Sequence, residues 1–250
     1  MTDLSWLGLG WLGVAERDAI GLSLQVAATA LAGLLPISIL LGWVLARWRS
    51  RARIVLDVAV HLPLVMPPVV TGYLLLLAFG RKGAIGSLLD QLFGLVFAFR
   101  WTGAALAAAV MALPLVVRPI RLAFEAADPR LNQAAAGLGV APWRAFLTIT
   151  LPLALPGILA GTILGFAKCL GEFGATVTFV SNIPGETRTL SLAVQTLLSA
   201  PGGDGPALRL AMVGIVIAIG ALVLAEIVTQ SMRRRLGLSA VPPSRPRRLA

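Results

Sequence analysis

The sequence has little charge, one cysteine and one histidine. Only 13% of its 250 residues are charged, about half the fraction found in typical soluble domains. The single Cys169 excludes an intrachain disulfide, and with the single His61 it leaves no cluster suited to a metal. No G-x-x-x-x-G-K-[ST] loop occurs, so the chain lacks the motif that cradles ATP phosphates. These absences argue against a soluble enzyme, a metalloprotein and an ATPase.

Long apolar runs are what the sequence has in abundance. Hydrophobic residues make up 58% of the chain, and the mean hydropathy is +0.89. A helix needs about 20 apolar residues to cross a bilayer core of about 30 Å. We therefore predict an all-α polytopic membrane protein with about five transmembrane helices, or six if 80–100 hides another membrane segment. The five runs are 19–46, 56–79, 102–124, 153–175 and 208–230.

The basic residues predict the topology. With the amino terminus outside and the carboxyl terminus inside, 14 of the 21 Lys and Arg residues fall on the cytoplasmic side, as the positive-inside rule requires. The net charge of +10 thus reflects topology and not a nucleic-acid partner. We expect residues 1–238 to form one transmembrane domain that begins with an uncleaved span. The Pro- and Arg-rich tail 239–250 is expected to be cytoplasmic, disordered and close to anionic lipid.

The second and fourth runs contain features that a plain membrane anchor does not need. Pro67 and Pro68 interrupt the second run, and broken helices near the midplane are typical of transport pathways. Lys168 and Glu172 lie four residues apart in the fourth run, where charges usually face a cavity or a partner. The alternatives are a packing kink and a structural ion pair. The candidate pathway or gate residues are Pro67, Pro68, Lys168, Glu172, Phe173, Gly174 and Thr176.

A glycine stripe precedes this pair. Gly157, Gly161 and Gly165 recur at intervals of four, which predicts close packing of the fourth span against another helix.

The stretch 128–157 lies between the third and fourth runs and is predicted to form two short helices. Asp128 is a good N-cap, Pro129 suits the first helical position, and Gly139 is a natural stop. A second helix can start at Pro142 and place Trp143, Phe146, Leu147 and Thr150 on one face. Two interpretations remain open, namely helices that lie on the headgroups and a cytoplasmic surface that engages another protein.

The spacing in this stretch resembles the EAA motif, E-A-A-x3-G-x9-I-x-L-P, of bacterial ABC importer permeases. Gln133 stands where the motif has glutamate, which removes one charge. The segments 61–76, 80–86 and 171–189, and the overall length, resemble molybdate transport permeases of the ModB type, and the resemblance extends to about residue 237. The matching positions are Gln133, Ala134, Ala135, Gly139, Ile149, Leu151 and Pro152.

The resemblance implies a type I ABC importer permease in the bacterial inner membrane, with residues 1–238 as the permease domain and 128–152 as its coupling loop. It implies a cytoplasmic ATPase dimer that holds ATP and Mg²⁺, a periplasmic molybdate-binding protein and a second permease copy. The chain itself would be non-catalytic and hold no cofactor or metal. Besides the matching positions, Trp143, Arg144 and Phe146 are expected to contact the ATPase.

Three alternatives remain. Sulfate, thiosulfate or tungstate permeases share the central motif, so the cargo rests on the resemblance alone. An ion-driven secondary transporter would need several buried carboxylates, and Glu172 is the only plausible one in the spans. A membrane-embedded enzyme would need clustered nucleophiles or bases, and His61, Cys169 and Glu172 are too scattered.

Overall fold

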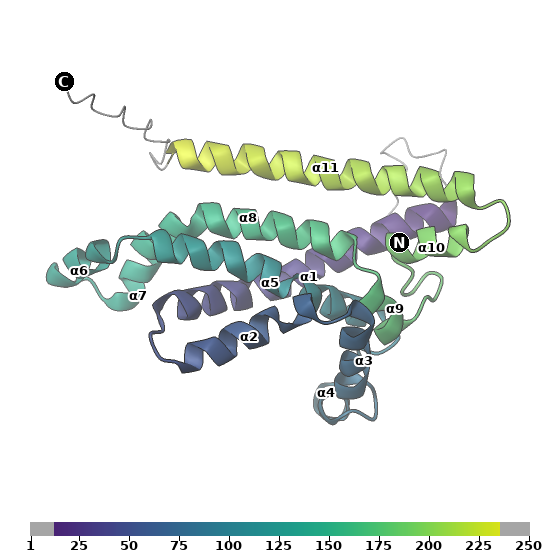
Figure 1. The fold of residues 1–250 in the computed structure, drawn as a ribbon, viewed down its shortest axis with the longest axis horizontal. Coiled ribbons are helices and arrows are strands. Elements are labelled where there is room, and N and C mark those ends of the chain that lie inside the picture. The colour runs from purple at the N-terminus through teal and green to yellow at the C-terminus, as the bar shows by residue number, and fades with distance from the viewer. Residues whose placement is uncertain (1–12, 236–250) are drawn as a thin grey trace, which may run out of the picture.

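A computed structural model describes residues 13–235 of the chain. Within that range the protein is a bundle of long helices (Figure 1), and four of them are long and apolar enough to cross a membrane. A bent helix pair brings the number to five, which agrees with the predicted count. The long helices are α1 (Val14–Arg47), α5 (Trp101–Ala126), α8 (Leu151–Leu170) and α11 (Asp204–Arg235). The tail 239–250 lies outside the described residues.

Shorter helices connect the long ones. The region 80–100 contains one helix of 10 residues, α4, which is too short to cross a bilayer. These elements are α2 (Ala52–Val65), α3 (Pro68–Phe79), α4 (Ala84–Phe93), α6 (Pro129–Gly137), α7 (Pro142–Ala145), the π-helical turn η2 (Phe146–Thr150), α9 (Gly174–Val180) and α10 (Leu190–Leu198).

The second run is not a straight span. The chain bends by 114° between α2 and α3. Met66 takes an extended conformation with ψ 145°, because the ring of the following proline disfavours the helical one. Pro68 then starts α3 at a position where its missing N–H costs nothing. The predicted break is therefore confirmed, and it takes the form of a sharp turn between two helices.

The fourth run also differs from the prediction at both ends. The helix ends at Leu170, not at residue 175, because the chain opens at Gly171 before α9 begins. At its other end, α7, η2 and α8 follow without a gap, so the expected separate second helix is the first part of a rod over Pro142–Leu170. In η2 the N–H of Leu151 donates to the carbonyl oxygen of Phe146. This wider turn lets the helix continue through Pro152 without a break.

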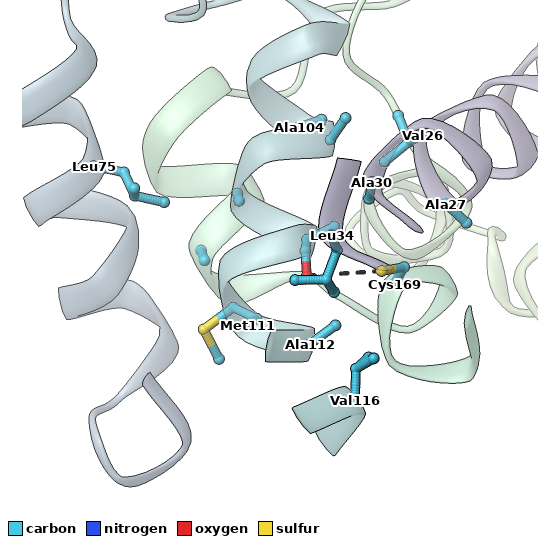
Figure 2. Close-up of a cluster of buried hydrophobic side chains, with 14 of the residues drawn as sticks. Val26, Ala27, Ala30, Leu34, Leu75, Ala104, Met111, Ala112, Val116 and Cys169 are labelled. Atoms are coloured by element: carbon cyan, nitrogen blue, oxygen red, sulfur yellow. Dashed lines mark hydrogen bonds between the residues drawn. The ribbon is translucent and has the colours of Figure 1, made fainter. Parts of the chain in front are cut away.

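The centre of the bundle is α5, which packs between α1 and α8. Its buried face is rich in alanine, and Ala104, Ala107 and Ala112 have no exposed surface. Figure 2 shows this core, where the Sγ of Cys169 on α8 donates to the carbonyl oxygen of Ala108 at 3.7 Å. Small side chains let the helices approach closely, which is how helices associate when lipid surrounds them.

The glycine stripe of α8 faces α5, as the sequence predicts. A methyl group on Gly161 would lie 2.7 Å from the carbonyl oxygen of Val116, and one on Gly157 would lie 2.6 Å from that of Pro119. Both distances are shorter than a van der Waals contact. The atoms approached belong to the helical backbone of α5, which cannot shift as a side chain would. The stripe therefore fixes how α8 sits on α5.

This contact yields a stability prediction. Gly161→Ala should lower the free energy of unfolding by about 1–3 kcal/mol, since the added methyl overpacks the α5–α8 contact. Gly33→Ala is the matched control, because that glycine is also helical and has no atom within 4 Å of the new methyl. The measurement is labelling of Cys169, which is buried in the folded protein, with a thiol-reactive dye during heating. Equal midpoints for both variants would contradict the packing role of the stripe.

Candidate functional site

The stretch 128–152 forms a compact loop at one end of the bundle. Figure 1 shows α6 and α7 at the end where α1 stops and α2 starts, while α9 and α10 lie toward the opposite end. The Arg-rich segment after α1 and this loop thus share one end, which is the arrangement that the predicted topology requires. We refer to residues 128–152 as the coupling loop.

The first helix of the coupling loop starts and stops where the sequence predicts. The side chain of Asp128 accepts a hydrogen bond from the N–H of Arg130 at 2.9 Å, so it caps α6. Gly139 has a φ of +77°. The N–H groups of Gly139 and Val140 donate to the carbonyl oxygens of Ala136 and Ala135, which is the Schellman arrangement that favours glycine.

The outer face of the coupling loop is apolar and open. Leu138 is 84% exposed and Trp143 is 61% exposed, and the guanidinium of Arg144 lies 5.1 Å from the centre of the Trp143 ring. Gln133, Ala134 and Gly139 are exposed too. Single exposed apolar residues are ordinary on a surface, whereas several large ones on one short loop make it a candidate contact site. The members of this outer face are Leu131, Leu138, Trp143 and Leu147.

The inner face of the coupling loop holds it against the bundle. The Phe146 ring lies 5.8 Å from that of Trp43 on α1 and 6.2 Å from that of Phe124 on α5. The hydroxyl of Thr150 and the side-chain amide of Asn132 lie within hydrogen-bond distance, at 3.0–3.1 Å. The prediction that Trp143, Phe146, Leu147 and Thr150 share one face is therefore wrong. Phe146 and Thr150 face the bundle, whereas Trp143 and Leu147 are exposed.

The sequence did not single out Asn132 or Trp43 as parts of this site. Neither residue stands out locally, because their partners are 18 or more positions away. Of the remaining motif positions, Ala135 is buried, and Ile149, Leu151 and Pro152 are half-buried where the loop enters α8.

The two helix breaks lie against each other at the far end of α8. A methyl group on Gly174 would come within 2.8 Å of the Cβ of Pro68, and one on Gly72 within 2.5 Å of the carbonyl oxygen of Ala175. The starts of α3 and α9 are thus in direct contact. Irregular backbone at membrane depth needs protein or a water-filled cavity around it. The structure therefore brings the two sets of predicted pathway residues together.

Glu172 lies inside this junction and is almost fully buried, at 3% exposure. One carboxylate oxygen pairs with the Nζ of Lys168 at 2.5 Å, and the other accepts the N–H of Ala175 at 3.1 Å. Glu172 stands in the break between α8 and α9, whereas Lys168 lies in the last turn of α8. Thr176 is buried beside it on α9, whereas Phe173 is 37% exposed.

A second charged cluster, which the sequence analysis did not identify, ties α2 to α5. Arg121 on α5 pairs with Asp57 on α2 at 2.9 Å and with Glu125 at 2.8 Å. His61 Nδ1 lies 3.3 Å from the Asp57 carboxylate. Because α2 ends in the 114° turn, this cluster holds one side of the turn to the central helix. Between residues 13 and 235, no group of three or more His, Cys, Asp or Glu side chains could hold a metal ion.

One continuous rod links the two regions. The helix over Pro142–Leu170 has 29 residues and spans about 40 Å at 1.5 Å per residue. It carries the open coupling loop at one end and the junction of broken helices at the other. Membrane-length helices, abutting breaks and an exposed loop for a partner define a membrane transport subunit.

The comparisons with known proteins give the family. Residues 38–234 match the model of the binding-protein-dependent transport system inner membrane component, and the chain belongs to that family. The chain is 53% identical to the molybdenum transport system permease protein ModB of Escherichia coli strain K12 over 222 residues, or 89% of this chain and 97% of that protein. The corresponding protein of Haemophilus influenzae is 51% identical over the same shares.

A solved structure supports the fold. The chain is similar to a bacterial alginate ABC transporter in complex with an alginate pentasaccharide-bound periplasmic protein, with a TM-score of 0.67 and 18% identity. The match covers 96% of this chain and 85% of that chain. The type I ABC importer permease fold expected from the sequence is thereby confirmed.

The buried ion pair yields the second prediction. Lys168→Met should lower the free energy of unfolding by about 3 kcal/mol, since it leaves the buried Glu172 carboxylate without its counter-ion. The double variant Lys168→Met/Glu172→Gln should recover most of that loss, because the glutamine oxygen can still accept the Ala175 N–H. Thermal unfolding followed by tryptophan fluorescence measures both. A double variant as unstable as the single one would contradict a coupled pair.

Proposed function

We propose that this chain is the membrane-spanning subunit of an ABC importer for molybdate. The assignment of molybdate as the substrate is supported by the 53% identity to the E. coli molybdenum permease over 89% of the chain. The fold supports the assignment to the ABC importers. The chain would form the pathway and leave ATP hydrolysis, with its Mg²⁺, to a separate subunit, because its sequence has no loop of the kind that holds ATP phosphates.

The coupling loop would dock on that ATPase subunit. Its outer face offers exposed apolar side chains, and its inner face packs on α1 and α5 through Phe146. The bond between Asn132 and Thr150 joins the two ends of the loop to each other. A movement of the ATPase would therefore shift the loop as one piece. The rod Pro142–Leu170 would carry that shift to the junction of α3 and α9, which is a rigid-body switch between two openings.

The junction would be the gate of the pathway. A tetrahedral dianion accepts hydrogen bonds, so hydroxyls and backbone N–H groups suit its passage. A dense arginine cage would hold it too tightly. We propose Pro67, Pro68, Phe173, Gly174 and Thr176 as pathway residues, with Lys168 and Glu172 holding the break in shape.

The remaining partners follow from the same function. A periplasmic molybdate-binding protein would deliver the anion, a second copy of the chain would complete the pathway, and two ATPase subunits would bind the two coupling loops. The assembly would lie in the bacterial inner membrane with the coupling loop and the carboxyl terminus in the cytoplasm.

Transport assays test the substrate. Cells that lack their own molybdate permease, supplied with this chain, its ATPase and its binding protein, should take up radiolabelled molybdate, and excess sulfate should not compete. Omitting the ATPase should abolish uptake. Uptake that persists without the ATPase would instead indicate an ion-driven transporter, and strong competition by sulfate would overturn the assignment of molybdate.

A glycine pair tests the coupling loop. Gly139→Val should reduce both ATPase co-purification and uptake several-fold, because valine at a φ of +77° is strained by about 1–2 kcal/mol and would distort the loop. Gly137→Val is the matched control two residues earlier, where the backbone is helical and no atom lies within 4 Å of an added methyl. Wild-type uptake by the Gly139 variant would remove the loop from the coupling mechanism.

A further inference from the structure

A cavity separates the inner face of the coupling loop from the end of α1. Its volume is about 310 Å³, and it lies on the side of the loop opposite the outer face. It is distinct from the gate, which lies at the other end of α8. Its principal lining residues are Trp43, Arg47, Asn132, Phe146 and Thr150.

The cavity contains one guanidinium nitrogen without a partner, on the half-buried side chain of Arg47. The Nη2 atom of Arg47 is buried and has no hydrogen-bond partner among the described residues, and it is the only charged atom there in that condition. No acidic residue lines the cavity. A buried N–H donor without a partner is unfavourable, and this one belongs to a cation, so an anion from outside the chain is its natural complement.

The surroundings indicate which anion. Arginine presents a planar fork of N–H donors that matches a phosphate group. Arg49, Arg51 and Arg53 follow within six residues and add positive potential at the same end of α1. Trp43 also lines the cavity, and tryptophan gathers at the level of lipid headgroups.

An apolar stripe on α1 runs along the helix to Arg47 and the cavity. Ile37, Leu40 and Trp43 are 54%, 59% and 38% exposed, and with Arg47 they lie on one side of the helix. A stripe of this kind can pack along an acyl chain while the arginine binds the phosphate of the same molecule.

We propose that this cavity binds a phosphate group through Arg47, and that a phospholipid carries that phosphate. Inorganic phosphate shares the same chemistry and is the alternative carrier. The proposal does not rest on the transport function. It would make an anionic lipid a structural part of the contact between α1 and the coupling loop.

Native mass spectrometry of the purified full chain, titrated with phosphatidylglycerol, tests the proposal. Arg47→Gln should weaken lipid binding by about 10-fold or more, the usual scale for a charge-assisted hydrogen bond. Arg49→Gln, two residues away and exposed, is the control and should change it less than about twofold. A parallel titration with inorganic phosphate, followed by tryptophan fluorescence, identifies the carrier. An Arg47-dependent response to phosphate alone would assign the site to the free anion.

Equal lipid binding by all three proteins, with no response to phosphate, would overturn the proposal. If Arg47→Gln fails to fold, brominated phosphatidylglycerol keeps the proposal testable, because bromine quenches tryptophans that it touches. The lipid should quench the folded wild-type protein measurably more than Trp43→Phe. Identical quenching of the two would show that no lipid occupies the cavity.

Discussion

Lipid offers no hydrogen-bond partner to an open backbone, and this constraint governs how the bundle is built. Two of its helices are interrupted, one at Met66–Pro67 and one at Gly171–Phe173. Each interruption is covered by the other, since the starts of α3 and α9 touch at Pro68 and Gly174. Glu172 supplies an acceptor for an N–H group of α9 and receives its counter-ion from the preceding turn of α8. Each break therefore shields the open backbone of the other from lipid.

The same junction is mechanically connected to the far end of the molecule. Glycines on α8 bring it within van der Waals contact of the α5 backbone, and the helix continues without a gap into η2 and α7. The loop at that end is rigid on its inner face and open on its outer face. In the proposed mechanism, a partner that binds the open face acts on the proposed gate through this one helix.

The charged residues fall into two groups with different physical roles. Lys168 with Glu172, and Arg121 with Asp57 and Glu125, are pairs satisfied within the chain that hold broken or bent helices in place. Arg47 differs because its buried Nη2 finds no partner among the described residues. A chain with so few charges keeps most of the buried ones paired, and the exception indicates where something else binds.

Local patterns in the sequence were sufficient for the spans, the start and stop of α6, the proline break and the glycine stripe, because each depends on residues close together in the chain. The motif over 133–152 likewise indicated the family, which the comparisons confirm. Only the tertiary structure decided that the second run turns by 114°, that α8 stops at Leu170, and that the loop's aromatic residues divide between two faces. It alone paired Asn132 with Thr150, Arg121 with Asp57 and Pro68 with Gly174, since these contacts join segments whose separation in sequence carries no local signal.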